Sequence, residues 1–539
     1  MTLLYILLIL MILYFTVLKS KRSLHMLQQN LYNENNRYGR WITRNYKETI
    51  SLDWLGMFLC ATGAFVTYDL KRFNLAFLAG LIVFYLLCAF LFKRKMSHFK
   101  QKKPLVVTGR IKRLITTTSI IYLALILIFW LWFQDPQSMW VLLFILSIFA
   151  SFNFLLFYII NYINYPIERM VYHYYEKKAK NKLEDMPNLK IIGITGSYGK
   201  TSSKNILSDI LNIKYIARPT PKNLNTYYGL MITINNHLDK FDEFFIAEMG
   251  AYVKGEIKGL CELVHPKYGI LTRIGTAHLE TFGSEKNIQE GKFELIESLP
   301  LDGIGVLNRD DPKQVSYHLK NKCRIIWIGI DSEDADVRAT DIKCSSAGTT
   351  FNVHFKGDKK SYLFETRLLG KHNVYNILAS LALGKEFGID IKMLQKGVKN
   401  VRAVEHRLEL KRIGSFYQID DAYNSNPVGA ANALEVLSLM PGKKIVVTPG
   451  MIELGDKEQE LNQEFGREIA KVADLVILIG KKRTKPIQDG LKLEDYNEDR
   501  IVIFNDVREA YPYIQSLNTN GEEIYALFEN DLPDSYDEN

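Results

Sequence analysis

The chain contains 539 residues, which is enough for about three domains. Its formal net charge is +9, and much of the excess lies in loops beside apolar segments, where Lys and Arg set membrane topology and meet anionic headgroups. This distribution argues against nucleic-acid binding. The five cysteines form no C-x-x-C pair, which argues against a zinc site or a disulfide framework and fits a reducing, cytoplasmic setting.

Hydrophobic residues make up 47% of the chain and are concentrated in its first third. Residues 3–18 are almost wholly apolar and are followed by Lys19, Lys21 and Arg22, the reverse of the charge order in a cleaved signal peptide. We therefore predict an uncleaved anchor and an α-helical transmembrane domain over residues 1–165. Its five predicted spans lie near residues 3–18, 53–68, 73–92, 114–133 and 139–161, and the short 53–68 run is a candidate for half of a membrane-dipping hairpin.

Loop charges predict the orientation of these spans. Residues 19–52 and 93–113 are rich in Lys and Arg, whereas the turn 134–138 has no positive charge and carries Asp135. Basic loops stay on the cytoplasmic side, so the soluble part begins in the cytoplasm after Pro166. We predict a multi-pass protein of the cytoplasmic (inner) membrane, with the lipid bilayer as a partner and with soluble domains that have access to ATP.

The remaining two-thirds of the chain alternates apolar strands with helical patterns, which predicts parallel α/β sheets. The expected strands cover 191–195, 244–248, 268–273, 304–308, 324–329, 444–448, 475–479 and 524–528. The expected helices cover 200–211, 286–298, 374–387, 426–439 and 458–472. A second α/β unit begins just after segment 400–412, so we place a domain boundary near residue 406.

Residues 191–204, IIGITGSYGKTSSK, predict a strand, a glycine-rich loop and a helix. In such a loop, backbone N–H groups and the helix N-terminus face phosphate oxygens, while Lys200 supplies a charge and Thr201 a hydroxyl for Mg²⁺. The spacing is Gly-x-x-Gly-Lys-Thr, shorter than the full Walker pattern because Ile194 stands where its first glycine would fall. The alternative is a tight turn before a helix.

Three polar residues near predicted strand ends or on helices are candidates for chemistry, each with a structural alternative. Glu248 ends a strand and is placed to hold Mg²⁺, unless it is a helix cap or a solvated strand end. His278 follows another strand, where a lone histidine is more often structural. Lys292 lies between Glu290 and Glu294 on a helix, a pattern typical of a solvated charged face.

Asparagine and aspartate clusters mark three further strand or helix ends. Asn308, Asp310 and Asp311 follow a strand, and Asn373 and Asn376 lie on the first turn of a helix, where amides suit a purine edge or a helix cap. The third cluster, at the start of a helix, comprises Asp420, Asp421, Asn424 and Asn426, with helix capping as the alternative because Asn-Pro favours turn initiation.

Taken in order, these segments resemble the Mur ligase family, and within it the MurF-type branch. The matching blocks are ITGSYGKTS, TPKNLNTYYG (220–229), IAEMGA (246–251), RIGTAHLETFGS (273–284), EGKFEL (290–295), VLNRDDP (306–312), GKHNVYN (370–376), EHRLEL (405–410), DDAYNSNP (420–427) and GMIELG (450–455). The resemblance covers about residues 187–539. It implies a P-loop central ATP-binding domain with a parallel-rich sheet over 187–405 and a Rossmann-like C-terminal domain over 406–539.

The resemblance also implies a reaction: ATP phosphorylates a substrate carboxylate to an acyl phosphate, and an amine then displaces phosphate. It implies an ATP-dependent acid–amino-acid ligase of cell-wall (peptidoglycan) biosynthesis, with an amino-acid or dipeptide amine and an envelope-precursor carboxylate, lipid-linked ones included, as substrates. The implied catalytic residues are Lys200, His278, Lys292 and Arg407.

The implied binding residues are carried over position by position. The nucleotide-binding residues are Gly196, Ser197, Tyr198, Gly199, Lys200, Thr201, Ser202, Asn308, Asn373, Asn376, Arg407 and Asp421, with Asn373 and Asn376 at adenine, Arg407 at the γ-phosphate and Asp421 near the ribose and phosphates. Thr201 and Glu248 would hold one Mg²⁺, His278 would hold a second, and Lys292 would be a CO₂-derived carbamate directed at the metal. Tyr423, Asn424 and Asn426 would line the amine side.

Three departures from the family pattern bear on substrates. Membrane spans stand where muramoyl ligases have a UDP-gripping domain, Tyr198 replaces the usual Asn or Thr, and the tail ALFENDLPDSYDEN (526–539) lacks a Lys-Gly-Ser-Arg run. A poly-γ-glutamate-synthase-like or folylpolyglutamate-like ligase is therefore an open alternative. A non-catalytic, nucleotide-sensing membrane module is another.

Overall fold

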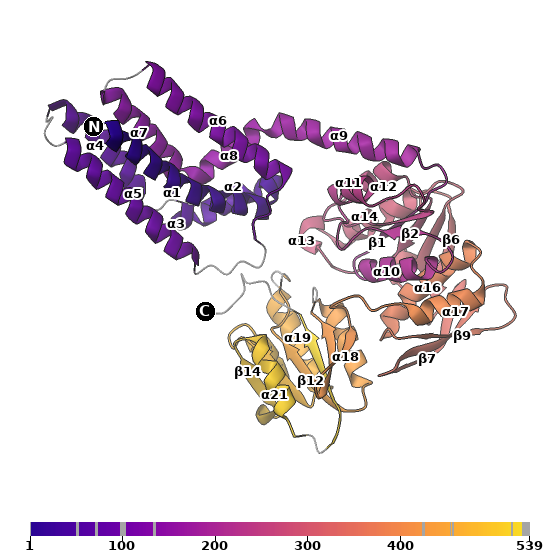
Figure 1. Cartoon of the computed structure of the whole chain (residues 1–539). Coiled ribbons are helices and arrows are strands. Elements are labelled where there is room, and N and C mark those ends of the chain that lie inside the picture. The colour runs from indigo at the N-terminus through magenta and orange to yellow at the C-terminus, as the bar shows by residue number, and fades with distance from the viewer. Residues whose placement is uncertain are drawn as a thin grey trace. The chain divides into compact units, whose positions relative to one another are not determined.

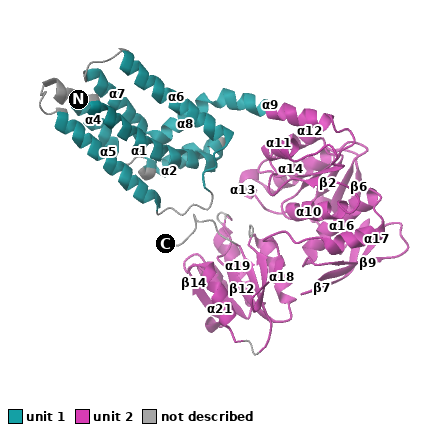
Figure 2. Ribbon diagram, in the orientation of Figure 1, with its two compact units in different colours: residues 1–174 teal, residues 175–539 magenta. Residues whose placement is uncertain are grey.

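The computed structural model describes residues 2–49, 53–69, 74–97, 104–132, 136–422, 426–452, 454, 457–518 and 521–530. The chain divides into two compact units, Met1–Tyr174 and Tyr175–Asn539, shown in teal and magenta in Figure 2.

The first unit is helical (Figure 1). Its elements are α1 (Thr2–Gln29), η1 (Leu31–Asn36), α2 (Arg37–Arg44), α3 (Tyr46–Thr49), α4 (Trp54–Asp69), α5 (Asn74–Ser97), α6 (Gly109–Trp132), α7 (Pro136–Ser151), α8 (Asn153–Ile163) and the first half of α9 (Tyr165–Glu184). Within the described residues, three helices are long and apolar enough to cross a membrane: Leu3–Gln29, Leu75–Ser97 and Gly109–Leu131. The bent pair Gln137–Ser151 and Asn153–Ile163 would make a fourth if it forms one span.

The five expected spans stay a prediction: within the described residues, three helices, or four with the bent pair, are long and apolar enough. The 139–161 run is not one helix, because it bends by 87° between α7 and α8. In α4 the apolar stretch among the residues with described side chains is Trp54–Gly63.

Buried polar side chains provide hydrogen-bond partners at the break between α7 and α8. The Lys19 ammonium donates to the Ser151 carbonyl (2.9 Å) and to Asp53 Oδ2 (2.8 Å). On the other side of the break, Asn153 accepts from Ser23 Oγ (2.6 Å) and donates to Ser20 Oγ (3.1 Å). These contacts supply partners to backbone and side-chain groups that an apolar interior would leave unsatisfied, which is why the bend is tolerated.

The second unit opens with a nine-stranded sheet, ordered β2-β3-β1-β4-β5-β6-β7-β8-β9. The strands are β1 (Lys190–Thr195), β2 (Ala217–Pro219), β3 (Phe244–Glu248), β4 (Tyr268–Leu271), β5 (Ile304–Asn308), β6 (Arg324–Gly329), β7 (Val337–Ser345), β8 (Gly348–Phe355) and β9 (Tyr362–Thr366). The helices are α10 (Lys200–Leu211), α11 (Tyr227–Asn236), α12 (Glu256–Val264), α13 (Leu279–Phe282), α14 (Glu285–Glu297), α15 (Pro312–Val315), α16 (Lys371–Glu386) and α17 (Ile391–Asn400). Pairing is parallel from β2 to β7 and antiparallel across β7, β8 and β9.

A six-stranded sheet follows, ordered β10-β11-β15-β12-β13-β14, and only its β10–β11 pair is antiparallel. Its strands are β10 (Glu409–Ile413), β11 (Phe416–Asp421), β12 (Lys443–Thr448), β13 (Leu475–Ile479), β14 (Ile501–Phe504) and β15 (Ile524–Glu529). Its helices are α18 (Pro427–Ser438), α19 (Glu458–Ala470), α20 (Lys485–Leu493), η3 (Glu498–Arg500), η4 (Val507–Glu509) and α21 (Ala510–Ser516). The expected α/β class with parallel-rich sheets is confirmed.

Packing on β1 fixes the position of α14. A Cβ at Gly193 would lie 2.5 Å from Leu295 Cδ1, so only glycine lets the helix approach the strand this closely. Leu295 and Ile296 are fully buried against the sheet. The carboxyl ends of β1, β3 and β4 share one edge because the strands are parallel, and Lys292 of α14 contacts Ala251 in the segment that follows β3.

Candidate active site

The loop between β1 and α10 is built to approach a ligand closely. Gly196 has φ +147°, and a Cβ there would lie 1.9 Å from Thr272 Oγ1. Thr272 Oγ1 in turn donates to the carbonyls of Tyr198 (2.6 Å) and Thr195 (3.0 Å). The loop is thus fastened to the segment after β4, and the strand–loop–helix expected from residues 191–204 is present.

Lys200 begins α10, and its ammonium folds back on the loop. It donates to the carbonyls of Gly196 (2.8 Å) and Ser197 (3.1 Å). Burial lowers its pKa to about 8, against the opposing effect of Glu248, and the Arg407 guanidinium lowers it further. The lysine therefore holds a charge that is poorly solvated and would gain from a phosphate partner.

The loop also carries Tyr198, the position that departs from the family pattern. A Cβ at Gly275 would lie 2.1 Å from the Tyr198 ring, so that ring fills the space beside Gly275. The Ser197 amide donates to the Arg273 carbonyl (2.9 Å) and its hydroxyl donates to the Gly275 carbonyl (3.3 Å). The phosphate loop and the 273–278 segment are therefore packed against each other.

Glu248, the last residue of β3, is buried and surrounded by donors, so the alternative of a solvated strand end is wrong. Its Oε1 accepts from Thr201 Oγ1 (3.1 Å) and Asn225 Nδ2 (3.1 Å). Its Oε2 pairs with the buried Lys204 ammonium at 3.0 Å. One carboxylate with an adjacent hydroxyl, beside a phosphate loop, is a donor set that Mg²⁺ uses when phosphates and water supply its other ligands.

Lys292 lies on α14 and is 1% exposed, so the pattern-based expectation of a solvated face is wrong. Glu290 and Glu294 form that solvated side instead: Glu290 pairs with Lys254, and Glu294 accepts from the amides of Gly255 (2.7 Å) and Lys258 (3.0 Å). The Lys292 ammonium donates to the Ala251 carbonyl at 3.3 Å. Burial, reinforced by nearby Lys200, lowers its pKa to about 7.

His278 precedes α13 with a left-handed φ of +62°, and its ring packs on Tyr252 at a centroid distance of 4.5 Å. Desolvation lowers its pKa, and the Lys292 and Lys200 ammonium groups lower it further. The two lysines and the histidine thus lie within electrostatic reach of one another. A neutral imidazole is the form that binds a metal.

The first turn of α16 contacts the phosphate-loop helix. Asn376 Oδ1 accepts from Ser203 Oγ (2.8 Å), and Asn373 Nδ2 donates to the Leu369 carbonyl (2.9 Å). The helix cap is Gly370, so capping by Asn373 is wrong. Asn308 is also buried and accepts from the Asp310 amide (2.9 Å), closing the turn after β5.

The structure describes some of the site residues that were predicted in the C-terminal domain. Asp421 ends β11, accepts from the Leu408 amide (3.2 Å), and has its pKa raised to about 6 by burial, against the effect of Arg407. Asn426 caps α18 by accepting from the Gly429 amide (3.0 Å), the capping that its sequence context also allowed. Tyr423 and Asn424 lie outside the described residues.

Comparison with known proteins matches both parts of the second unit. Residues 194–384 match the Mur ligase middle domain, and residues 406–524 match the Mur ligase, glutamate ligase domain. The UDP-N-acetylmuramoyl-tripeptide--D-alanyl-D-alanine ligase of Bacillus subtilis is 30% identical over 353 residues, covering 65% of this chain and 75% of the relative. The chain belongs to the Mur ligase family.

Further relatives agree with this assignment. The Escherichia coli ligase of the same name is 31% identical over 54% of this chain and 65% of its own length. A MurF structure from Acinetobacter baumannii superposes with a TM-score of 0.60 at 26% identity, covering 66% of this chain and 77% of that one. MurF from Thermotoga maritima in complex with ADP gives 0.58 at 26% identity, covering 67% and 80%.

This Mur ligase is an ATP-dependent acid–amino-acid ligase that forms a C–N bond. A non-catalytic nucleotide sensor is accordingly set aside. A folylpolyglutamate synthase of Mycobacterium tuberculosis shares only the fold, at 16% identity and a TM-score of 0.50.

Two residues of the Mur ligase site were missed from the sequence. Lys204 and Asn225 both contact the Glu248 carboxylate. Lys204 lies one helical turn after Thr201, which was a usable signal, since residues three apart share a helix face. Among the described residues, no group of three or more His, Cys, Asp or Glu forms a metal cluster, so a metal here would depend on phosphate and water as ligands as well.

Proposed function

We propose that this Mur ligase is anchored in the cytoplasmic membrane and joins an amino acid or dipeptide to an envelope-precursor carboxylate. ATP would phosphorylate the carboxylate, and the amine would then attack the acyl phosphate, forming the C–N bond and releasing phosphate. The nucleotide would lie against residues 196–202, with Asn308, Asn373 and Asn376 toward the base and Asp421 toward the ribose.

The observation that carries this proposal is the environment of Lys292. A fully buried lysine that pairs with no carboxylate among the described residues, and whose pKa is lowered to about 7, is costly to the fold, and such a group is a candidate for chemistry. At neutral pH a large fraction of it is the free amine, the form that adds to CO₂. As a carbamate, Lys292 would carry a negative charge beside Lys200 and would replace repulsion between two cations with attraction.

The remaining residues then have defined tasks. Lys200 would leave its two loop carbonyls for the phosphate oxygens, because an anion is a stronger partner than a carbonyl. Arg407 would add a second positive charge at the γ-phosphate, since it already acts electrostatically on Lys200. Mg²⁺ on Thr201 and Glu248, with a second ion near His278 and Lys292, would neutralise charge that develops on the transferred phosphoryl group.

The substrates are proposed from relatives and from the chain itself. The curated relatives are named for a UDP-N-acetylmuramoyl-tripeptide acceptor and a D-alanyl-D-alanine amine. The matched region begins at residue 194, after a unit of apolar helices. That unit supports an acceptor located at the membrane surface, and this acceptor is either UDP-linked or lipid-linked.

Phosphate release by full-length protein in nanodiscs tests the proposal. UDP-muramoyl-tripeptide and a lipid-linked muramoyl peptide would be supplied in parallel, each with and without D-Ala-D-Ala. Release that requires both acceptor and amine, with a product heavier by the amine minus water, supports a ligase on that acceptor. ATP hydrolysis that is independent of both would refute it.

The carbamate has its own test. Carbon-13 bicarbonate should give a carbamate NMR signal that is lost in Lys292→Ala and retained in Lys286→Ala, an exposed lysine on the same helix. Short carboxylates should partly restore activity to Lys292→Ala. An active Lys292→Ala enzyme would rule the carbamate out.

A further inference from the structure

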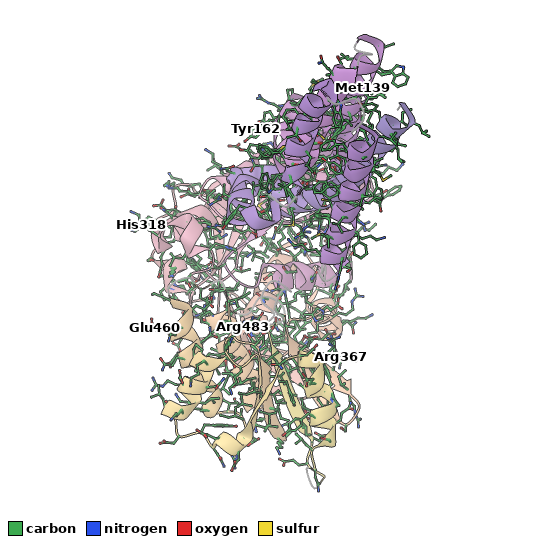
Figure 3. The ribbon with its side chains drawn as sticks, turned by 90° about the vertical axis from the view of Figure 1, so that its left-hand side faces the viewer. Met139, Tyr162, His318, Arg367, Glu460 and Arg483 are labelled. Carbon is green, nitrogen blue, oxygen red and sulfur yellow. The ribbon has the colours of Figure 1, made fainter. Side chains whose placement is uncertain are left out.

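Helix α9 carries an exposed apolar stripe. Ile167, Met170 and Tyr174 follow one another at helical spacing and are 48%, 72% and 65% exposed. Tyr162, labelled in Figure 3 at the end of α8, is 55% exposed as well. Soluble surface helices rarely present three consecutive large apolar positions of one face to water.

Several contacts of α9 with other elements lie on the opposite face of the helix. Glu168 accepts a bidentate pair of bonds from Arg113 of α6, at 2.7 Å each. Glu176 accepts from Lys180 (2.9 Å) and Tyr227 (2.7 Å), and Ala179 is fully buried. Ile167 and Met170, by contrast, stay largely exposed.

The charge of the exposed side is positive. Lys177 and Lys178 are exposed, while Glu168 and Glu176 are both engaged by basic side chains on the covered side. The only other acid of α9 is its last residue, Glu184. Along the helix the exposed side thus passes from apolar and aromatic to basic, the order expected of a helix that leaves the acyl boundary through anionic headgroups.

We propose that the exposed face of α9 docks on an anionic phospholipid surface, with Ile167 and Met170 in the headgroup–acyl boundary and Lys177 and Lys178 at lipid phosphates. This inference rests on the proposed membrane anchoring and adds to it. The Arg113–Glu168 pair fastens the opposite face of α9 to α6, one of the helices long enough to span a bilayer. The anchor would then hold the first turns of α9 at the membrane surface.

Photocrosslinking of the full chain tests this docking. p-Benzoylphenylalanine would replace Met170, or Tyr172 on the covered side as the matched control, or Leu123, a 58% exposed residue of α6 that reports insertion alone. Each protein would be irradiated in nanodiscs of phosphatidylglycerol and phosphatidylcholine, and lipid adducts would be detected by intact mass. We expect adducts at positions 123 and 170 and none at 172.

The outcomes separate the two proposals. An adduct at 123 without one at 170 overturns the docking of α9 and leaves the anchoring intact. Absence of adducts at both positions overturns both. A crosslink from position 170 to a second copy of the chain also overturns lipid docking, because it identifies a protein partner for the stripe.

The charge contribution is tested with Lys177→Gln/Lys178→Gln. Each lysine near an anionic surface strengthens binding about fivefold, so removing both should weaken docking about 30-fold and lower adduct yield at position 170. The yield at position 123 should not change. Equal yields at 170 for both proteins, or in pure phosphatidylcholine, would overturn the anionic-lipid assignment.

Discussion

Lys292→Met should make the protein more stable at neutral pH, which is unusual for a substitution in an active site. The lysine is 1% exposed and its pKa falls from 10.5 to about 7. That shift corresponds to about 5 kcal/mol of lost native-state stability when the group is protonated in both states. Methionine fills a similar volume without a charge and forfeits one long hydrogen bond, which costs about 1 kcal/mol.

The lowered pKa of Lys292 also predicts how the stability difference between the two proteins changes with pH. Between about pH 7 and 10.5 the unfolded chain holds a proton on this lysine and the folded chain does not, so wild-type stability rises with pH through that window. We expect Lys292→Met to be more stable by about 3 kcal/mol at pH 7 and the two proteins to converge toward pH 10. Lys286→Met, exposed on the same helix, should show no such difference.

Hydrogen exchange of the α14 peptides, measured at increasing urea concentrations in CO₂-free buffer, reports the local free energy of unfolding. Bicarbonate should raise wild-type protection and leave the methionine variant unchanged, because only the lysine forms a carbamate. A methionine variant that is less stable than wild type at pH 7, or a difference that does not vary with pH, would refute the account of Lys292.

Three further substitutions test the rest of the site. Lys200→Ala should abolish ATP turnover while leaving hydrogen exchange in α10 unchanged; retained turnover would contradict its role at the phosphates. Glu248→Gln removes the charge partner of the buried Lys204 and should lower the free energy of unfolding by about 3–5 kcal/mol. The double variant Glu248→Gln/Lys204→Met should regain stability but not Mg²⁺-dependent activity. If the double variant regained both stability and activity, Glu248 would lie outside the metal site. Gly196→Ala brings a Cβ to 1.9 Å from Thr272 Oγ1 and should weaken nucleotide binding in a filter or calorimetric assay, while wild-type affinity would contradict the tight loop.

Most strands of the ligase unit could be predicted because each is a short apolar run bounded by polar residues. The expected 244–248, 304–308, 324–329 and 475–479 coincide with β3, β5, β6 and β13. The antiparallel strands β7 to β9 were missed because residues such as Thr340, Lys343 and His354 alternate with apolar ones, the pattern of a half-solvated edge.

The site was harder to predict than the fold, because burial is a tertiary property. The glutamates around Lys292 suggested a solvated face, yet they cap and pair with the 254–258 segment while the lysine turns inward. The bend between α7 and α8 was likewise hidden in an apolar run, since the groups that satisfy it, Lys19 and Ser23, lie on a helix distant in sequence.

The most direct test of the account follows an oxygen atom. An acceptor with an oxygen-18 carboxylate would be incubated with the full-length protein, ATP and the amine, and the released phosphate analysed by mass. We predict one oxygen-18 in each phosphate, because the carboxylate oxygen attacks the γ-phosphoryl group and stays with it. Unlabelled phosphate from a completed ligation would contradict activation of the acid as an acyl phosphate.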